Sequence, residues 1–194
     1  LFRSRQSDGA FLKVYESGLE FLPWSTGDLT GDGRDELLGA ALMRLLVFTG
    51  NAASPFPSQR IFDQSSVWGG EIADIDADGQ NEIIARSGTD RGLRIFEYDS
   101  AVREIAFLPA PAPNTGDLGT RFVIADFDAD GHPEVLTGSA NGDLWIYEHR
   151  SGQFHLTWHR PGTGDARWIG GGQDIDADGA MEFAVARATT DSND

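Results

Sequence analysis

Short apolar runs, several of them interrupted by single polar residues, recur along the chain and predict β-strands rather than long helices. Stretches rich in glycine and proline, such as 110–119 and 161–164, separate groups of these runs. Two groups show the same order of four segments: Val67–Ala73, Glu82–Ala85, Leu93–Tyr98 and Glu104–Leu108, then Arg121–Ala125, Glu134–Thr137, Leu144–Glu148 and Phe154–Trp158. We therefore expect repeated units of four strands.

One segment fits two structures. Glu36–Phe48 is rich in leucine and alanine and could form a helix, but its alignment with the other repeats favours two strands. The apolar stretch Leu37–Phe48 is also too short for a membrane-spanning helix and is interrupted by Arg44. No insertion into a membrane is expected.

A nine-residue acidic motif is repeated four times. It occupies Asp28–Glu36, Asp74–Glu82, Asp126–Glu134 and Asp174–Glu182, with starts separated by 46, 52 and 48 residues. This period is typical of propeller blades with four short strands each. The prediction is one all-β domain over residues 1–194, a β-propeller of four-stranded antiparallel blades with about four repeats. It is either a complete small propeller or a section of a larger one.

The two ends of the chain look complementary. Gly9–Glu16 resembles the third strand of a repeat, and the last repeat stops at Asp194, just before its third strand is due. Either the ends meet in one blade, or the chain belongs to a longer propeller with further blades. Because only 12 residues separate Glu16 from Asp28, the first repeat is expected to be one strand short.

Charge and composition narrow the partners. The 31 acidic residues against 15 basic ones give a formal net charge of −16, which disfavours nucleic acids and anionic membranes and favours cations. The chain has no cysteine, so disulfides and thiolate ligands are excluded. The four histidines show no spacing typical of a zinc site.

The acidic motif supplies the oxygen ligands that calcium prefers. Side chains at positions one, three, five and nine and the carbonyl at position seven are the expected ligands, and glycine at position six allows the sharp turn. In the first loop Thr30 replaces a carboxylate, so about four Ca²⁺ ions are expected, with the first site the weakest. The expected ligands are Asp28, Thr30, Asp32, Arg34 and Glu36; Asp74, Asp76, Asp78, Gln80 and Glu82; Asp126, Asp128, Asp130, His132 and Glu134; and Asp174, Asp176, Asp178, Ala180 and Glu182.

Two other readings of the motif are weaker. An EF-hand loop starts in the same way but needs glutamate at position twelve, where this chain has Gly39, Ala85, Thr137 and Val185, and it needs flanking helices. Ordinary Asp-Gly turns would not require several carboxylates to gather in one place, where they repel one another.

The loops resemble those of the FG-GAP/VCBS repeats found in integrin α-subunit propellers and in many bacterial surface proteins. Trp68–Gly79 is similar to both the aromatic-glycine lead-in and the metal loop of that family. Ala77, Ala129 and Ala177 stand where the family usually has glycine, and glutamate stands at position nine where integrins use aspartate. The resemblance implies a calcium-binding propeller.

Three functions remain open. The favoured one is a calcium-stabilised binding, adhesion or scaffold module of a secreted or cell-surface protein, which recognises an extracellular protein or glycan. Because cytosolic calcium is too low to fill such sites, an extracellular, periplasmic or cell-surface location is expected. The second is a polysaccharide lyase similar to rhamnogalacturonan lyases, although no catalytic residue or organic cofactor is predicted. The third is a purely structural part of a larger assembly.

Overall fold

The computed structural model describes residues 2–4, 11–13, 22–54, 56–111, 118–119 and 121–186. These residues form β-strands, turns and irregular segments, and they contain no helix, so the all-β prediction is confirmed for this part of the chain. Within these residues, no helix is long and apolar enough to cross a membrane.

Three sheets each contain four antiparallel strands that are hydrogen-bonded in chain order. The first sheet consists of β3 (Leu22–Gly27), β4 (Glu36–Ala41), β5 (Arg44–Thr49) and β6 (Gln59–Ser65). The second consists of β7 (Val67–Ala73), β8 (Glu82–Ser87), β9 (Gly92–Asp99) and β10 (Ala101–Pro109). The third consists of β11 (Val123–Ala125), β12 (Glu134–Gly138), β13 (Leu144–Arg150) and β14 (Gln153–Arg160).

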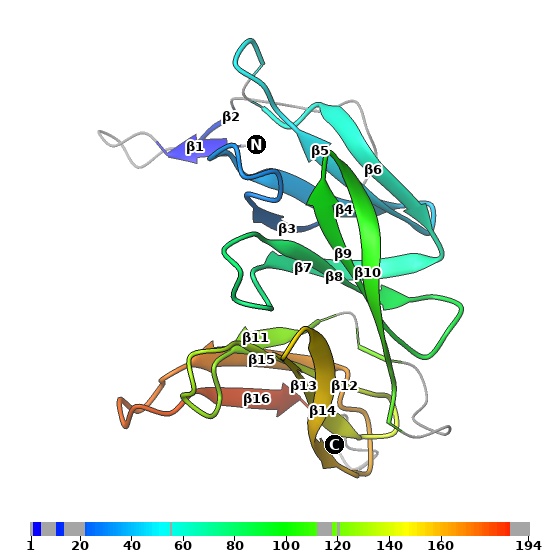
Figure 1. Ribbon diagram of the computed structural model, residues 1–194, viewed down its shortest axis with the longest axis vertical. Coiled ribbons are helices and arrows are strands. Elements are labelled where there is room, and N and C mark those ends of the chain that lie inside the picture. The colour runs from blue at the N-terminus through cyan, green and yellow to red at the C-terminus, as the bar shows by residue number, and fades with distance from the viewer. Residues whose placement is uncertain are drawn as a thin grey trace, which may run out of the picture.

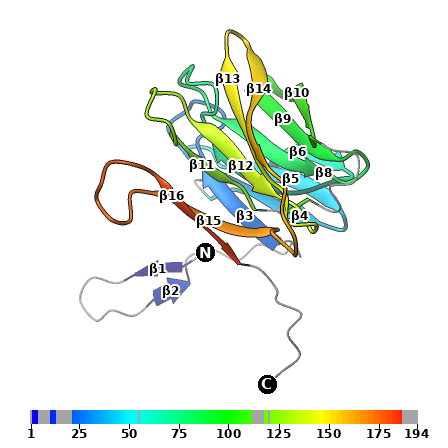
Figure 2. The same ribbon diagram turned by 90° about the horizontal axis from the view of Figure 1, so that it is seen from below.

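Two further sheets have two strands each. The fourth sheet pairs β15 (Trp168–Gln173) with β16 (Glu182–Ala186). A separate hairpin pairs β1 (Phe2–Ser4) with β2 (Phe11–Lys13) and lies outside the other sheets (Figure 2). Each of the four acidic motifs connects the first strand of a sheet to the second, at the same place in every repeat.

The strands of the first sheet and of the N-terminal hairpin decide several of the sequence predictions. The segment 36–48 forms β4 and β5, so the helix alternative is wrong and the two-strand alternative is confirmed. The expectation that the first repeat lacks a strand is wrong, because β3–β6 form a complete four-stranded sheet. Of Gly9–Glu16, only residues 11–13 are described, and they pair with β1. Among the described strands, the two ends of the chain do not share a sheet.

The sheets pack against one another in chain order. In Figure 1 the first sheet lies above the second, and the third and fourth sheets lie together below them. An apolar cluster joins the first and second sheets and includes Leu38, Val47 and Phe96. A further cluster joins the third sheet to the fourth through residues such as Leu136 and Ile169. Removal of these apolar surfaces from water is what holds neighbouring sheets together.

The third sheet shows how one strand serves two interfaces. On β13, Trp145 and Tyr147 point toward the second sheet and pack with Ile95 and Leu108. Leu144 and Ile146 belong instead to the cluster shared with the fourth sheet. Because side chains alternate between the faces of a strand, a strand between two sheets needs large apolar residues at nearly every position. This explains why Leu144–Tyr147 on β13 is a continuous apolar run.

Candidate metal-binding loops

The four acidic loops share one backbone conformation. We call them the first to fourth loops, at residues 28–36, 74–82, 126–134 and 174–182. In each, the aspartate at position one accepts hydrogen bonds from backbone N–H groups further along the loop. Asp126, for example, accepts from Asp130 N at 3.1 Å and from Gly131 N at 2.9 Å. These bonds curl each loop around its first aspartate.

Two positions of each loop have a left-handed backbone. Position six is glycine in every loop, and its φ is 92° at Gly131. Position four is glycine in the first loop, but it is alanine in the other three, with φ of 61° at Ala77, 59° at Ala129 and 63° at Ala177. A left-handed alanine is strained, so these three loops keep a conformation that local backbone preference opposes.

Position nine is a glutamate that begins the second strand of each sheet. Glu36, Glu82 and Glu134 are buried, and Glu182 is half-buried. One carboxylate oxygen, Oε2, accepts a hydrogen bond from the backbone N–H at position two, for example from Ile75 N at 3.0 Å to Glu82. The other three glutamates accept the same bond. The glutamate therefore ties the start of the loop to its end.

Carboxylate oxygens converge in three of the four loops. In the third loop and the fourth loop, one oxygen from each of the aspartates at positions one, three and five and from the glutamate at position nine lie within 4.8 Å of one another. In the second loop Asp74, Asp76 and Asp78 do so, without Glu82. Among the described residues, the first loop forms no such group. Gathered hard oxygen ligands of this kind suit Ca²⁺.

Burial and mutual repulsion shift the acidity of these groups. Burial is the main cause that raises the pKa of Glu82 to about 8, and Asp76, Asp78 and Asp74 raise it further, while the hydrogen bond from Ile75 N lowers it. The pKa of Glu134 is raised to about 7, again mainly by burial, with added repulsion from Asp128 and Glu148. The pKa of Asp76 is also raised by burial and by Asp78. A cation in these loops would relieve this repulsion.

Glu134 gives the most direct indication that a cation fits. The residue is only 3% exposed, and its Oε1 atom has no hydrogen-bond partner among the described residues. A buried carboxylate oxygen without a partner is costly, and a metal ion would satisfy it. The donor set of Asp126, Asp128, Asp130 and Glu134 therefore fits a hard dication.

The first loop satisfies its carboxylates without a metal. Both Leu29 N and Thr30 N donate to Glu36 Oε2, at 2.9 Å and 3.0 Å. Thr49 on β5 donates its hydroxyl to Glu36 Oε1 at 2.7 Å. Arg34 forms an ion pair with Asp32 at 3.0 Å. The prediction that this site is the weakest therefore gains a physical reason.

Residues outside the motif also reach the loops. Thr49 is one, and Glu148 and Arg150 on β13 are the others. Glu148 lies directly opposite Glu134 in the antiparallel ladder, and Arg150 forms ion pairs with Glu148, Asp128 and Asp130. A comparison of the third strands shows Thr49 and Glu148 at the same place, five residues into segments that start at Leu45 and Leu144. That alignment could have identified Thr49 and Glu148 as neighbours of the loops, whereas nothing in the sequence indicates where the Arg150 side chain points.

The backbone carbonyl ligands expected at Arg34, Gln80, His132 and Ala180 remain predictions, as does ligation by the side chain of Thr30.

A repeated sheet with an acidic loop between its first and second strands defines a class of repeat proteins. The family model described as FG-GAP-like repeat matches residues 74–137 and 126–185, which together cover more than half of the chain. The chain belongs to the FG-GAP-like repeat family, as the sequence resemblance implied. The matched residues include the second, third and fourth loops and leave out the first. No curated protein matches the chain.

Proposed function

We propose that this chain is a calcium-stabilised β-propeller module, whole or partial, that serves binding, adhesion or scaffolding in a secreted or cell-surface protein. The observation that carries the proposal is the convergence of carboxylates in three equivalent loops, with a buried and unpartnered Glu134 Oε1 in one of them. Membership of the FG-GAP-like repeat family supports it. The second, third and fourth loops are the proposed Ca²⁺ sites, and the first holds its shape by protein contacts alone.

The metal has a structural task in this proposal. At about 1 mM free calcium and a dissociation constant of about 0.1 mM, each site adds roughly 1.4 kcal/mol to the free energy of unfolding. Three such sites add roughly 4 kcal/mol, a substantial part of the stability of an ordinary domain. Cytosolic calcium would leave the sites empty, which supports an extracellular, periplasmic or cell-surface location.

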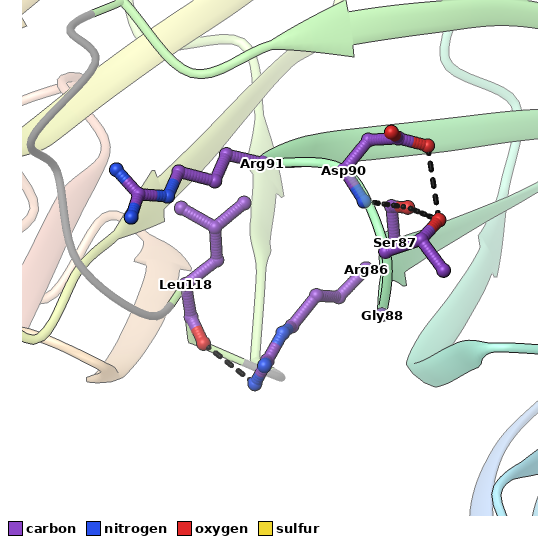
Figure 3. Close-up of a pocket in the computed structure, with 7 residues that line it drawn as sticks. Arg86, Ser87, Gly88, Asp90, Arg91 and Leu118 are labelled. Atoms are coloured by element: carbon purple, nitrogen blue, oxygen red, sulfur yellow. Dashed lines mark hydrogen bonds between the residues drawn. The ribbon is translucent and has the colours of Figure 1, made fainter.

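A protein or glycan partner would contact the end of the sheets away from the acidic loops. At that end of the second sheet, the turn between β8 and β9 borders a hollow of about 160 Å³ (Figure 3). Arg86 and Arg91 line it together with Ser87, Asp90 and Leu118, and Arg86 donates to the Leu118 carbonyl at 3.0 Å. Arginine side chains at the rim of a hollow suit an acidic group of a partner, such as a carboxylate.

Binding of the chain to a panel of immobilised glycans and surface proteins, with calcium and again with a chelator, tests this function. The proposal predicts that some acidic glycan or surface protein retains the chain in calcium and releases it in the chelator, and that Arg86→Ala weakens retention at a temperature where the variant, which loses the hydrogen bond to Leu118, is still folded. Calcium-dependent formation of unsaturated product from pectic polysaccharides would contradict the non-enzymatic assignment. Retention of no glycan and no surface partner would favour a purely structural role.

A further inference from the structure

The third loop carries its own cation. Arg150, at the end of β13, places its guanidinium NH2 atom 3.3 Å from Asp128 Oδ2 and 3.2 Å from Asp130 Oδ2. The Nε atom of the same guanidinium donates to Glu148 Oε1, and this bond holds the group beside a buried carboxylate. Asp128 and Asp130 are two of the four carboxylates that converge in this loop. The arginine is thus held on the candidate metal site itself.

The atoms contacted by Arg150 are those that the loop leaves open. Oδ1 of Asp128 accepts from Asp130 N at 3.3 Å, and Oδ1 of Asp130 accepts from His132 N at 2.9 Å. The backbone therefore occupies one oxygen of each carboxylate, and the arginine occupies the other. A divalent ion that gathers these carboxylates must compete with the guanidinium for the same oxygens, or tolerate a positive charge a few ångströms away.

The equivalent position of the third strand in the first and second sheets holds no cation. Alignment of the third strands on Leu45, Leu93 and Leu144 places Asn51 and Asp99 at the position of Arg150. In the second sheet, Arg103 pairs with Glu97 at 3.5 Å and with Asp99 at 3.7 Å, and no ion pair within the described part of the chain joins it to the aspartates of the second loop. Arg150 is therefore a feature of the third repeat among the three sheets whose third strand is described.

We infer that Arg150 is an affinity-determining residue of the third loop, a tethered cation that neutralises the loop when metal is absent and opposes the binding of Ca²⁺. This inference rests on the proposed calcium binding by the loops. Removal of the charge has two opposite consequences. The third loop binds Ca²⁺ more tightly, because the competitor is gone, and the metal-free chain becomes less stable, because its carboxylates lose their counter-ion.

A site-resolved titration tests the inference. The amide signals of Gly79, Gly131 and Gly179 report separately on the second, third and fourth loops, because each donates to the first aspartate of its own loop. Following these signals by NMR during a Ca²⁺ titration gives one affinity for each loop. Arg150→Gln removes the charge, and Arg150→Lys keeps it. Arg103→Gln is the matched control, because it changes the net charge equally but lies away from the aspartates of the third loop.

The expected result is that Arg150→Gln tightens Ca²⁺ binding at Gly131 by about three- to tenfold, the range implied by the loss of exposed ion pairs, and leaves Gly79 and Gly179 unchanged. The metal-free melting temperature should fall in the same variant. Arg150→Lys and Arg103→Gln should leave the affinity at Gly131 close to that of the parent chain.

Unchanged or weaker binding at Gly131 in Arg150→Gln, with normal binding at the other loops, would overturn this inference alone. No response at any of the three glycines in the parent chain would overturn the proposed calcium binding and this inference with it.

Discussion

At the scale of single residues, two left-handed positions of the third loop, Ala129 and Gly131, allow a matched pair of substitutions. Ala129 has φ of 59° and Gly131 has φ of 92°, and a Cβ atom at Gly131 would meet no atom within 4 Å. Only backbone strain therefore separates alanine from glycine at position six. Gly131→Ala should lower the free energy of unfolding by about 1–2 kcal/mol, and Ala129→Gly should raise it by about 0.5–1 kcal/mol. Urea unfolding in a chelator measures both changes. A loss of stability in Ala129→Gly would show that this alanine makes contacts worth more than its strain.

Protonation of the position-nine glutamates gives a dependence on pH. The folded-state pKa values of Glu82 and Glu134, about 8 and about 7, lie above the ordinary value of 4.5. Between about pH 4.5 and pH 8, the folded chain therefore binds more protons than the unfolded chain. The resulting stability is fully present below about pH 4.5 and is lost as the pH rises through 7 and 8. In a chelator, the melting temperature should fall from pH 5 to pH 9.

Calcium should reverse much of this loss, because a bound cation favours the ionised carboxylates. The double variant Glu82→Gln, Glu134→Gln should have a flatter pH profile in the chelator and should gain less from calcium. Melting curves at several pH values, with and without calcium, give the comparison. Equal slopes in the parent chain and the variant would show that other groups control the pH dependence.

At the scale of strands and loops, the first loop should behave differently from the third. Thr49→Val removes the hydroxyl that donates to Glu36, a buried carboxylate. The unfolding free energy should fall by about 1–3 kcal/mol, by the same amount with calcium and with a chelator, because no metal is proposed there. Asp128→Ala should instead lose stability mainly in calcium. Parallel melts of both variants measure the difference, and a calcium-dependent loss in Thr49→Val would assign a metal to the first loop.

The sequence was sufficient to predict most of the strands and the loops, but not the residues of other strands that contact the loops. The order of four strands and the position of each loop follow from the apolar runs and from the repeated motif, and the strands at 67–73, 82–87, 92–99 and 101–109 confirm them. The first sheet was expected to be one strand short because only 12 residues separate Glu16 from Asp28, whereas the sheet takes all four of its strands, β3–β6, from residues 22–65. Thr49, Glu148 and Arg150 were missed because they act across the ladder, and their roles depend on register rather than on local sequence.

At the scale of the whole molecule, the contacts between sheets are independent of the metal. Trp145 is only 1% exposed and packs from β13 against the second sheet, within the cluster that contains Ile95 and Leu108. Trp145→Ala should lower the free energy of unfolding by about 3–5 kcal/mol, because it leaves a cavity between two sheets. The loss should be the same in calcium and in a chelator. The exposed Trp158 offers a control, since Trp158→Ala removes the same side chain type from a position with 38% exposure and should cost much less.

The distribution of charge links this framework to the loops. The chain has a formal net charge of −16, and its carboxylates converge in three equivalent loops. Three dications would cancel six of these negative charges, at the places where they repel one another most strongly. The sheets thus supply a packed frame, and in the proposed function bound Ca²⁺ would stabilise the hairpins at one end of it.

Calcium titration by calorimetry, with thermal melts in parallel, shows whether the loops bind calcium and are stabilised by it. Binding should saturate at about three ions, and the melting temperature should rise by roughly ten degrees, from about 4 kcal/mol of added stability. Asp128→Ala should remove one of the bound ions and part of the rise. If the chain binds no calcium and its melting temperature does not change, the loops are ordinary acidic turns, and both the calcium-stabilised module and its extracellular location lose their support.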